Sequence, residues 1–316
     1  MQTVNTAIIE FEQSDEFLRL AAGTRKRHRN FLVRLKDMAG SAKPIAQLRR
    51  TDLDAVLAER RDGGAGERTL NGYKSTLRLF CGWLAAVGYT KTNIASHLKD
   101  GKGVTPKSKR KPLTVQQLKK MIELAEAQHP RDAMTLLLFS YTACRQSEVI
   151  NLRWRDVDME GRALNIYRPK MTDYHTVAMS PPLFEALEKW RKWVEEHHGE
   201  VKGTWFVVPA RAHRGFVEGL PYKMSAEWPL VPEKRQTRTL QTVKRLMVAV
   251  GVEDMVGKGT HTLRRTAANL IVEKAGGDVR AAQFLLGHSS LTMTEKYLDV
   301  DAAAAKYGAM MREWEI

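Results

Sequence analysis

The 316-residue sequence contains little cysteine and no long apolar run. Its two cysteines, Cys81 and Cys144, are far apart and form no Cys-x-x-Cys pair, so neither a disulfide framework nor a zinc ribbon is indicated. No stretch of about 18 apolar residues exists, and the N-terminal segment has neither the basic start nor the apolar run of a signal peptide. We therefore expect a cytoplasmic protein that does not associate with membranes.

Two signatures of bound ligands are also missing. No Walker-type glycine-rich loop is present, so nothing indicates the use of a nucleotide. The carboxylates do not cluster at the spacing of metal ligands. We expect no cofactor and no metal.

Positive charge is what the chain has in excess. Its 51 lysines and arginines outnumber its 36 aspartates and glutamates, which gives a formal net charge of +15. These basic residues are spread along the whole length, and such a surface suits an extended polyanion such as double-stranded DNA better than a small acidic substrate. A soluble protein that is merely cationic is the alternative on charge alone.

The length accommodates two domains, each with a core of its own. Residues 1–97 form the first predicted domain, in which helical periodicity begins near residue 14. Its strongest helix is predicted in residues 69–88, with Lys74 and Arg78 on the charged face. That face indicates either solvated charge or contact with a DNA backbone.

Residues 98–112 lack apolar periodicity and contain two prolines, two glycines and a run of positive charge. This composition is typical of an extended basic linker, and such a linker can lie along a phosphate backbone. The candidate DNA contacts in it are Lys107, Lys109 and Arg110.

Residues 113–316 form the second predicted domain. Thr114 and Asp132 are predicted to cap its first two helices, and the second of these is apolar enough to be central and buried. Alternation in residues 162–180 predicts two short strands around a turn at residues 171–173. Helical patterns return afterwards, with three consecutive segments following Thr260. The whole chain is therefore predicted to be mainly α, with a small β-element.

Four windows of this domain carry residues suited to phosphoryl transfer. In that reaction negative charge spreads over the nonbridging oxygens, and the planar, permanently charged arginine fork holds such oxygens well. Taken singly each window has an ordinary structural explanation, but together they form an ordered set. The set comprises Arg145 with Glu148 three residues later, Lys170 near the hairpin tip, His261 with Arg264, and His288 followed by Tyr297.

In its order and spacing this set resembles the tyrosine recombinases, or phage integrase family, over residues 113–300. The helical domain is similar, more weakly, to the family's core-binding domain. The resemblance implies a SAM-like helical domain and a mixed α+β catalytic domain that form a C-shaped clamp on DNA. Two residues depart from the family pattern. Arg265 stands where many members have a second histidine, and Cys144 precedes the first arginine where other residues are common.

The resemblance implies a role for each residue of the set. Tyr297 is the nucleophile that forms a 3′-phosphotyrosyl bond, Arg145 and Arg264 clamp the scissile phosphate, and Glu148 supports Arg145. His288 donates a further hydrogen bond, His261 assists proton movement, and Lys170 protonates the departing 5′-oxygen. Rejoining then needs neither metal nor ATP, because the bond energy is kept in the phosphotyrosine.

The resemblance also implies partners. These are a double-stranded recombination site, a homo-oligomer that is a dimer on one site and a tetramer in synapsis, and in some systems an accessory directionality protein. Residues 303–316 are predicted to form a tail helix that docks on a neighbouring subunit. No extra domain of about 60 residues precedes residue 14, so we expect no separate arm-binding module and a nucleoid-associated enzyme that acts on short sites.

Three alternatives remain open. A type IB topoisomerase shares the nucleophile and the clamp, although the length and the match to the set favour recombination. A helical DNA-binding regulator without catalysis would need no nucleophile at all. A metal-dependent nuclease is the weakest, because clustered carboxylates are missing.

Overall fold

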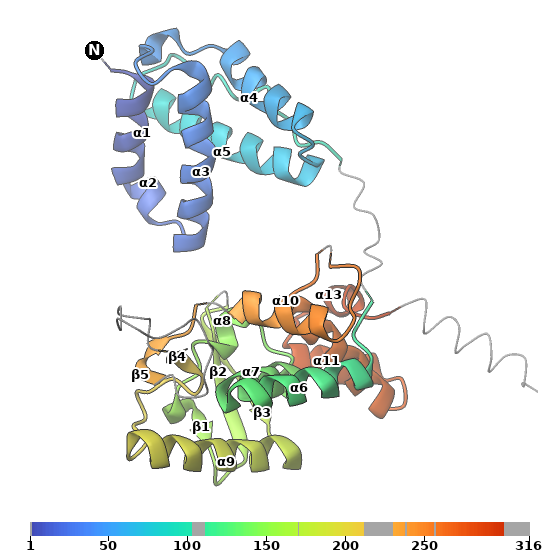
Figure 1. Cartoon of the computed structure of the whole chain (residues 1–316). Coiled ribbons are helices and arrows are strands. Elements are labelled where there is room, and N and C mark those ends of the chain that lie inside the picture. The colour runs from blue at the N-terminus through green and yellow to red at the C-terminus, as the bar shows by residue number, and fades with distance from the viewer. Residues whose placement is uncertain are drawn as a thin grey trace, which may run out of the picture. The chain divides into compact units, whose positions relative to one another are not determined.

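The computed structural model describes residues 2–102, 111–169, 171–211, 230–237, 239–255 and 257–299. It divides into two compact units, Met1–Ser108 and Lys109–Ile316, and each is described here by itself (Figure 1). The division falls inside the segment 98–112, for which a linker is predicted. Among the described residues, no helix is both long enough and apolar enough to cross a membrane.

The first unit is helical throughout its described part. Aromatic rings fill its centre, where Phe11 packs edge-on against Phe17 and Phe80 at centroid distances of 5.1 and 5.5 Å. Its helices are α1 (Val4–Gln13), α2 (Asp15–Leu18), α3 (Ala22–Ala39), α4 (Arg50–Asp62) and α5 (Glu67–Ala86), with a 3₁₀ turn η1 (Ile45–Gln47).

The prediction that helical structure begins near residue 14 was wrong, because α1 precedes it. This helix buries Val4, Ala7, Ile8 and Phe11, which follow the spacing of one helix face. The hydroxyl of Thr3 caps it by accepting a hydrogen bond from the Thr6 amide at 3.2 Å. Both the apolar spacing and the capping threonine can be recognised in the sequence.

The charged face predicted for α5 is not a solvated surface. Lys74 is only 8% exposed, and its ammonium donates to Glu67 Oε1 at 2.6 Å. Arg78 donates to the carbonyl of Leu98 at 2.6 Å and to Asp100 at 2.9 Å. Arg78 therefore joins α5 to the segment after it, whereas Lys74 is buried and paired within α5, so the alternative of solvated charge does not hold for Lys74.

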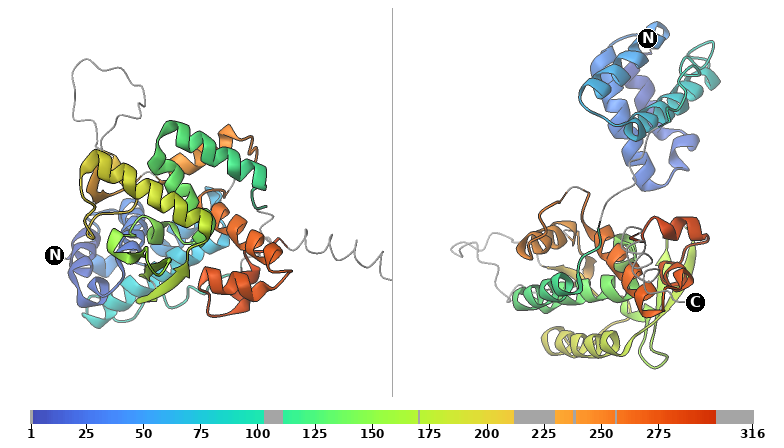
Figure 2. Two further views of the ribbon diagram at one scale, coloured as in Figure 1. Left: turned by 90° about the horizontal axis from the view of Figure 1, so that it is seen from below. Right: turned by 90° about the vertical axis from the view of Figure 1, so that its right-hand side faces the viewer.

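The second unit contains most of the secondary structure. Its central helix, α7, packs against α6, α9 and α11, and Figure 2 shows α6, α7 and α9 as adjacent layers. The helices are α6 (Val115–Gln128), α7 (Pro130–Thr142), α8 (Gln146–Val149), α9 (Pro181–His198), α10 (Thr239–Ala249), α11 (Thr260–Lys274), α12 (Val279–Leu286) and α13 (Leu291–Glu295), with a 3₁₀ turn η2 (Trp154–Asp156).

Of the two predicted caps, one is confirmed. The Thr114 hydroxyl accepts from the Gln117 amide at 3.1 Å at the start of α6. Asp132, however, does not cap α7, which starts two residues earlier. Pro130 occupies the first turn, where its missing N–H costs nothing, and His129 Nδ1 accepts from the Arg131 amide at 3.0 Å.

The predicted hairpin is present as β2 (Ala163–Arg168) and β3 (Asp173–Ala178), which pair antiparallel. Leu164, Ile166 and Val177 bury against the core, and Arg168 lies opposite Asp173 where the hairpin closes. Strand β1 (Val157–Asp158) adds to β2, and β4 (Pro209–Arg211) pairs with β5 (Leu230–Arg235) in a second sheet. These three strands were not predicted, because their short runs carry little alternation.

A buried ionic cluster joins the start of α7 to β4. Asp132 is 3% exposed and accepts from Arg131 Nε at 3.0 Å and from Arg211 Nη2 at 2.9 Å. Arg131 also donates to the carbonyl of Pro209 at 3.1 Å. Burying these charges costs desolvation free energy, which their mutual pairing offsets.

We expect Asp132→Ala to lower the free energy of unfolding by about 3–5 kcal/mol, because it leaves two buried guanidinium groups without their carboxylate. Urea denaturation measures the loss. The matched control is Glu195→Ala, which breaks the exposed Arg191–Glu195 pair of 3.0 Å and should cost under about 1 kcal/mol. Equal losses in the two variants would contradict this account of the cluster.

Candidate active site

Arg145 lies between two helices, where the chain turns sharply. Helix α7 ends at Ala143, which adopts a left-handed conformation with φ 52°, and Arg145 is the N-cap of α8. Glu148 accepts from the Arg145 amide at 2.7 Å and from Arg145 Nη1 at 2.8 Å. The contact expected from their spacing is therefore present, and the nearly buried carboxylate fixes both the main chain and the guanidinium.

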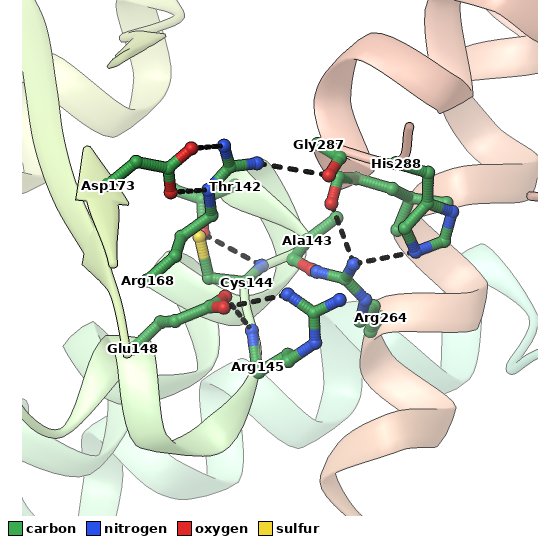
Figure 3. A network of polar contacts seen from close by, with 11 residues as sticks. Thr142, Ala143, Cys144, Arg145, Glu148, Arg168, Asp173, Arg264, Gly287 and His288 are labelled. Carbon is green, nitrogen blue, oxygen red and sulfur yellow. Dashed lines mark hydrogen bonds and ion pairs between the residues drawn. The ribbon is translucent and has the colours of Figure 1, made fainter. Parts of the chain in front are cut away.

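Arg264, on α11, is 1% exposed. Its guanidinium donates to the carbonyls of Ala143 and Leu286, the latter at 2.8 Å, and its Nη2 lies 3.1 Å from His288 Nε2. Burial lowers the Arg264 pKa, and the nearby charge of Arg145 lowers it further. Figure 3 shows the two guanidinium groups turned toward the same space.

His288 follows α12 directly, after Gly287 ends the helix in a left-handed conformation with φ 60°. Its Nδ1 lies 3.0 Å from the hydroxyl of Thr294, which is completely buried. Burial lowers the pKa of His288 to about 4, and the charges of Arg264 and Arg145 act in the same direction. The imidazole is therefore neutral at neutral pH.

Tyr297 is half-buried and its ring lies beside these groups. The ring centroid is 5.4 Å from that of His288 and 5.4 Å from Arg264 Cζ, and Arg265 Cζ lies 5.7 Å away. Helix α13 ends at Glu295, and Tyr297 stands in the turn that follows. Asn269 of α11 holds this turn by donating to the Tyr297 carbonyl at 2.9 Å.

The β2–β3 hairpin is fastened beside His288 by an ion pair. Arg168 donates to both carboxylate oxygens of Asp173, at 2.9 and 2.5 Å, and to the carbonyl of Gly287 at 3.0 Å. The carboxylate raises the Arg168 pKa, and the guanidinium lowers that of Asp173. Lys170 itself lies outside the described residues, between Pro169 and Met171 of the turn.

The structure does not test the remaining predicted site residues as members of this site. His261 is exposed in the first turn of α11, one turn before the buried Arg264. Lys74 and Arg78 belong to the first unit. The linker residues Lys107, Lys109 and Arg110 lie outside the described residues.

Sequence reasoning missed four residues that shape this site: Arg168, Asp173, Asn269 and Thr294. Arg168 and Asp173 flank the predicted turn with opposite charges, and that was a usable signal of pairing across the hairpin. Nothing local in the sequence marks Asn269, because its partner is the main chain of a residue 28 positions away.

The model of the phage integrase family matches residues 111–304, which is more than half of the chain. The chain belongs to this family. The recombinase is 30% identical over 265 residues to tyrosine recombinase XerC of Mesorhizobium japonicum, covering 82% of this chain and 77% of that protein. It is 31% identical over 285 residues to tyrosine recombinase XerC of Agrobacterium fabrum, covering 86% and 80%. These matches confirm the predicted family and enzyme class, a tyrosine site-specific recombinase.

Solved structures confirm the fold class of the recombinase. A lambda integrase fragment crystallised as a dimer bound to a COC′ core site matches with a TM-score of 0.68 at 18% identity, over 92% of this chain and 97% of that one. The Tn1549 transposon integrase in complex with circular intermediate DNA matches with a TM-score of 0.60 at 16% identity, over 97% and 99%.

A side chain at Gly287 of the recombinase would displace the Arg168 guanidinium from its present contacts. A Cβ there would lie 2.3 Å from Arg168 Nη1, and the positive φ adds strain of about 1–2 kcal/mol. Gly287→Ala should therefore destabilise more than the control Gly276→Ala, which has φ +68° but no atom within 4 Å of its Cβ. Thermal denaturation measures the stability of both variants. An equal loss of stability in the two would argue against a tight contact between Gly287 and Arg168.

The stability of the recombinase should fall as the pH drops from 6.5 toward 4. The pKa of both His129 and His288 is lowered to about 4 from 6.5, chiefly by burial, so over this window the unfolded chain binds protons that the folded one does not. Each histidine lowers the free energy of unfolding by about 1.4 kcal/mol for each pH unit of this fall. Denaturation at several pH values in this range gives the free energy of unfolding as a function of pH. Its slope should be shallower for His129→Gln than for the wild type, and an unchanged slope would show that His129 does not cause the loss.

Proposed function

We propose that the recombinase breaks and rejoins DNA through Tyr297. The phenol gives up its proton as its oxygen attacks the scissile phosphorus and forms a 3′-phosphotyrosyl bond; the bond to the 5′-oxygen breaks, and that oxygen takes up a proton and leaves as a hydroxyl. Rejoining reverses these steps with a 5′-hydroxyl as nucleophile. The phosphoester is conserved at each step, so no nucleotide is consumed.

One observation carries the proposal. Two guanidinium groups, those of Arg145 and Arg264, face one space that the neutral His288 and the ring of Tyr297 also border. Glu148 is the carboxylate bound to Arg145, whereas Arg264 donates to two carbonyls and lies beside His288. A phosphate placed there gains two forked cationic donors and relieves the repulsion between them.

The other roles follow from family resemblance. His261 assists proton movement at the first turn of α11, and Lys170 protonates the departing 5′-oxygen. A lysine amine suits that acid role where neighbouring cations lower its pKa.

We further propose double-stranded DNA as substrate and a homo-oligomer as the acting form. The lambda integrase structures support this, since one is a dimer bound to a core site and another a tetramer bound to a Holliday junction. Contacts of the basic linker with the DNA backbone, docking of residues 303–316 on a neighbouring subunit, and an accessory directionality protein belong to the same proposal. The engaged ammonium of Lys74 makes it the weakest of the suggested DNA contacts.

Tyr297→Phe should abolish the covalent adduct while leaving DNA binding intact, because only the nucleophilic oxygen is removed. A pool of nicked duplexes of randomised sequence, incubated with EDTA, traps and identifies the adduct on denaturing gels. Arg264→Ala should lower the rate of adduct formation by at least about 10²-fold.

The matched control is Tyr174→Phe, which alters a tyrosine that is 61% exposed on β3 and should keep the wild-type rate. Adduct formation by Tyr297→Phe would overturn the assignment of the nucleophile. Cleavage that requires a divalent metal would indicate a nuclease, and DNA binding by the wild type without any adduct would indicate a regulator.

A further inference from the structure

Thr294 contacts both His288 and Tyr297. It lies on α13 and is completely buried. Its hydroxyl is 3.0 Å from His288 Nδ1, and its carbonyl accepts from the Tyr297 amide at 2.8 Å. A single buried residue thus joins the histidine ring to the main chain of the tyrosine.

The neighbours of His288 determine which ring nitrogen carries the proton. Arginine has donors only, so Nε2, which lies 3.1 Å from Arg264 Nη2, must accept. In a neutral imidazole the other nitrogen then carries the hydrogen, and Nδ1 donates it to Thr294. In this tautomer, Nε2 has no hydrogen to offer a phosphate.

Entry of a phosphate changes this requirement. Once phosphate oxygens take the donors of Arg264, Nε2 can contact the phosphate only as a donor, and so it must gain a hydrogen. If the ring becomes a cation, Nδ1 still donates to Thr294; if it changes tautomer, Nδ1 must accept instead. A hydroxyl serves in both cases because it can donate and accept, whereas a methyl group serves in neither.

We propose that Thr294 is a positioning residue for strand transfer, whose hydroxyl holds the Nδ1 side of His288 and thereby lets Nε2 change from acceptor to donor. The inference rests on the proposed function, since it requires a phosphate between Arg264 and Tyr297. The charged groups facing His288 are Arg264 from α11 and Arg145 and Glu148 at α8. They affect its charge without replacing the Thr294 contact.

The first test needs no DNA. Nitrogen NMR of ¹⁵N-histidine-labelled protein, with the His288 signals assigned by their loss in His288→Gln, reports which nitrogen is protonated. Wild type and Thr294→Ser should show a neutral ring with a slowly exchanging Nδ1 proton. Thr294→Val should lose that protection. A proton on Nε2 in the wild type, or a protected Nδ1 proton in Thr294→Val, would overturn the inference.

The second test measures the rate of adduct formation on a duplex recovered from the randomised pool. Thr294→Val should be slower by on the order of 10- to 10²-fold, the loss expected from misplacing a catalytic group by about 1 Å. Thr294→Ser should stay close to wild type, because it keeps the hydroxyl. In a His288→Ala background, Thr294→Val should cause no further loss.

The outcomes separate three conclusions. A wild-type rate in Thr294→Val overturns the positioning role. An equal loss in the wild-type and His288→Ala backgrounds shows that Thr294 only maintains the fold, and this also overturns the role. If the wild type forms no adduct that depends on Tyr297, the proposed function fails and the role fails with it, which distinguishes that failure from the other two.

Discussion

The buried guanidinium of Arg264 is where three parts of the second unit meet. It bonds the carbonyl of Ala143, which ends α7, the carbonyl of Leu286, which ends α12, and the ring of His288. Helix ends expose carbonyls without intrahelical partners, and a buried cation satisfies two such ends at once. The arginine needs these carbonyls as much as they need it, because a buried charge without hydrogen bonds is costly. Through these contacts Arg264 binds the helix end two residues before Arg145 and touches the rings of both His288 and Tyr297.

The charges of these residues leave the site with an excess of positive charge. Arg145 has a carboxylate partner in Glu148, whereas the carbonyls that bind Arg264 offer dipoles and no full negative charge. Burial, helped by the charges of Arg264 and Arg145, lowers the pKa of His288 and keeps it neutral, so the site holds positive charge in its arginines and leaves the histidine able to switch. An anion with several oxygens complements such a site better than a single carboxylate, because each arginine fork can engage two oxygens.

The sequence predicted those features whose cause is local. Arg145 and Glu148 are three residues apart, and the capping Thr114 precedes its helix directly, so spacing alone was enough for both. The ordered family set named distant residues as one site, and Arg145, Arg264, His288 and Tyr297 of that set lie together in the structure. The burial of Lys74 could not be predicted in this way, because it depends on which side of α5 the rest of the unit covers. Thr294 looked like any helical threonine, and only the fold shows His288 beside it.

Tyr297, the proposed nucleophile, is held differently from the two arginines. Arg145 and Arg264 are fixed by side-chain bonds to a buried carboxylate and to helix ends, whereas Tyr297 is held through its main chain, which bonds to Thr294 and Asn269. Its ring is placed by packing against His288 and two guanidinium groups. Such contacts are individually weak, so the phenol can rotate toward a phosphate without breaking the bonds that hold the turn. Two firmly held arginines beside a phenol that can rotate suit the proposed reaction, in which the tyrosine oxygen must approach the phosphate, bond to it and later be released.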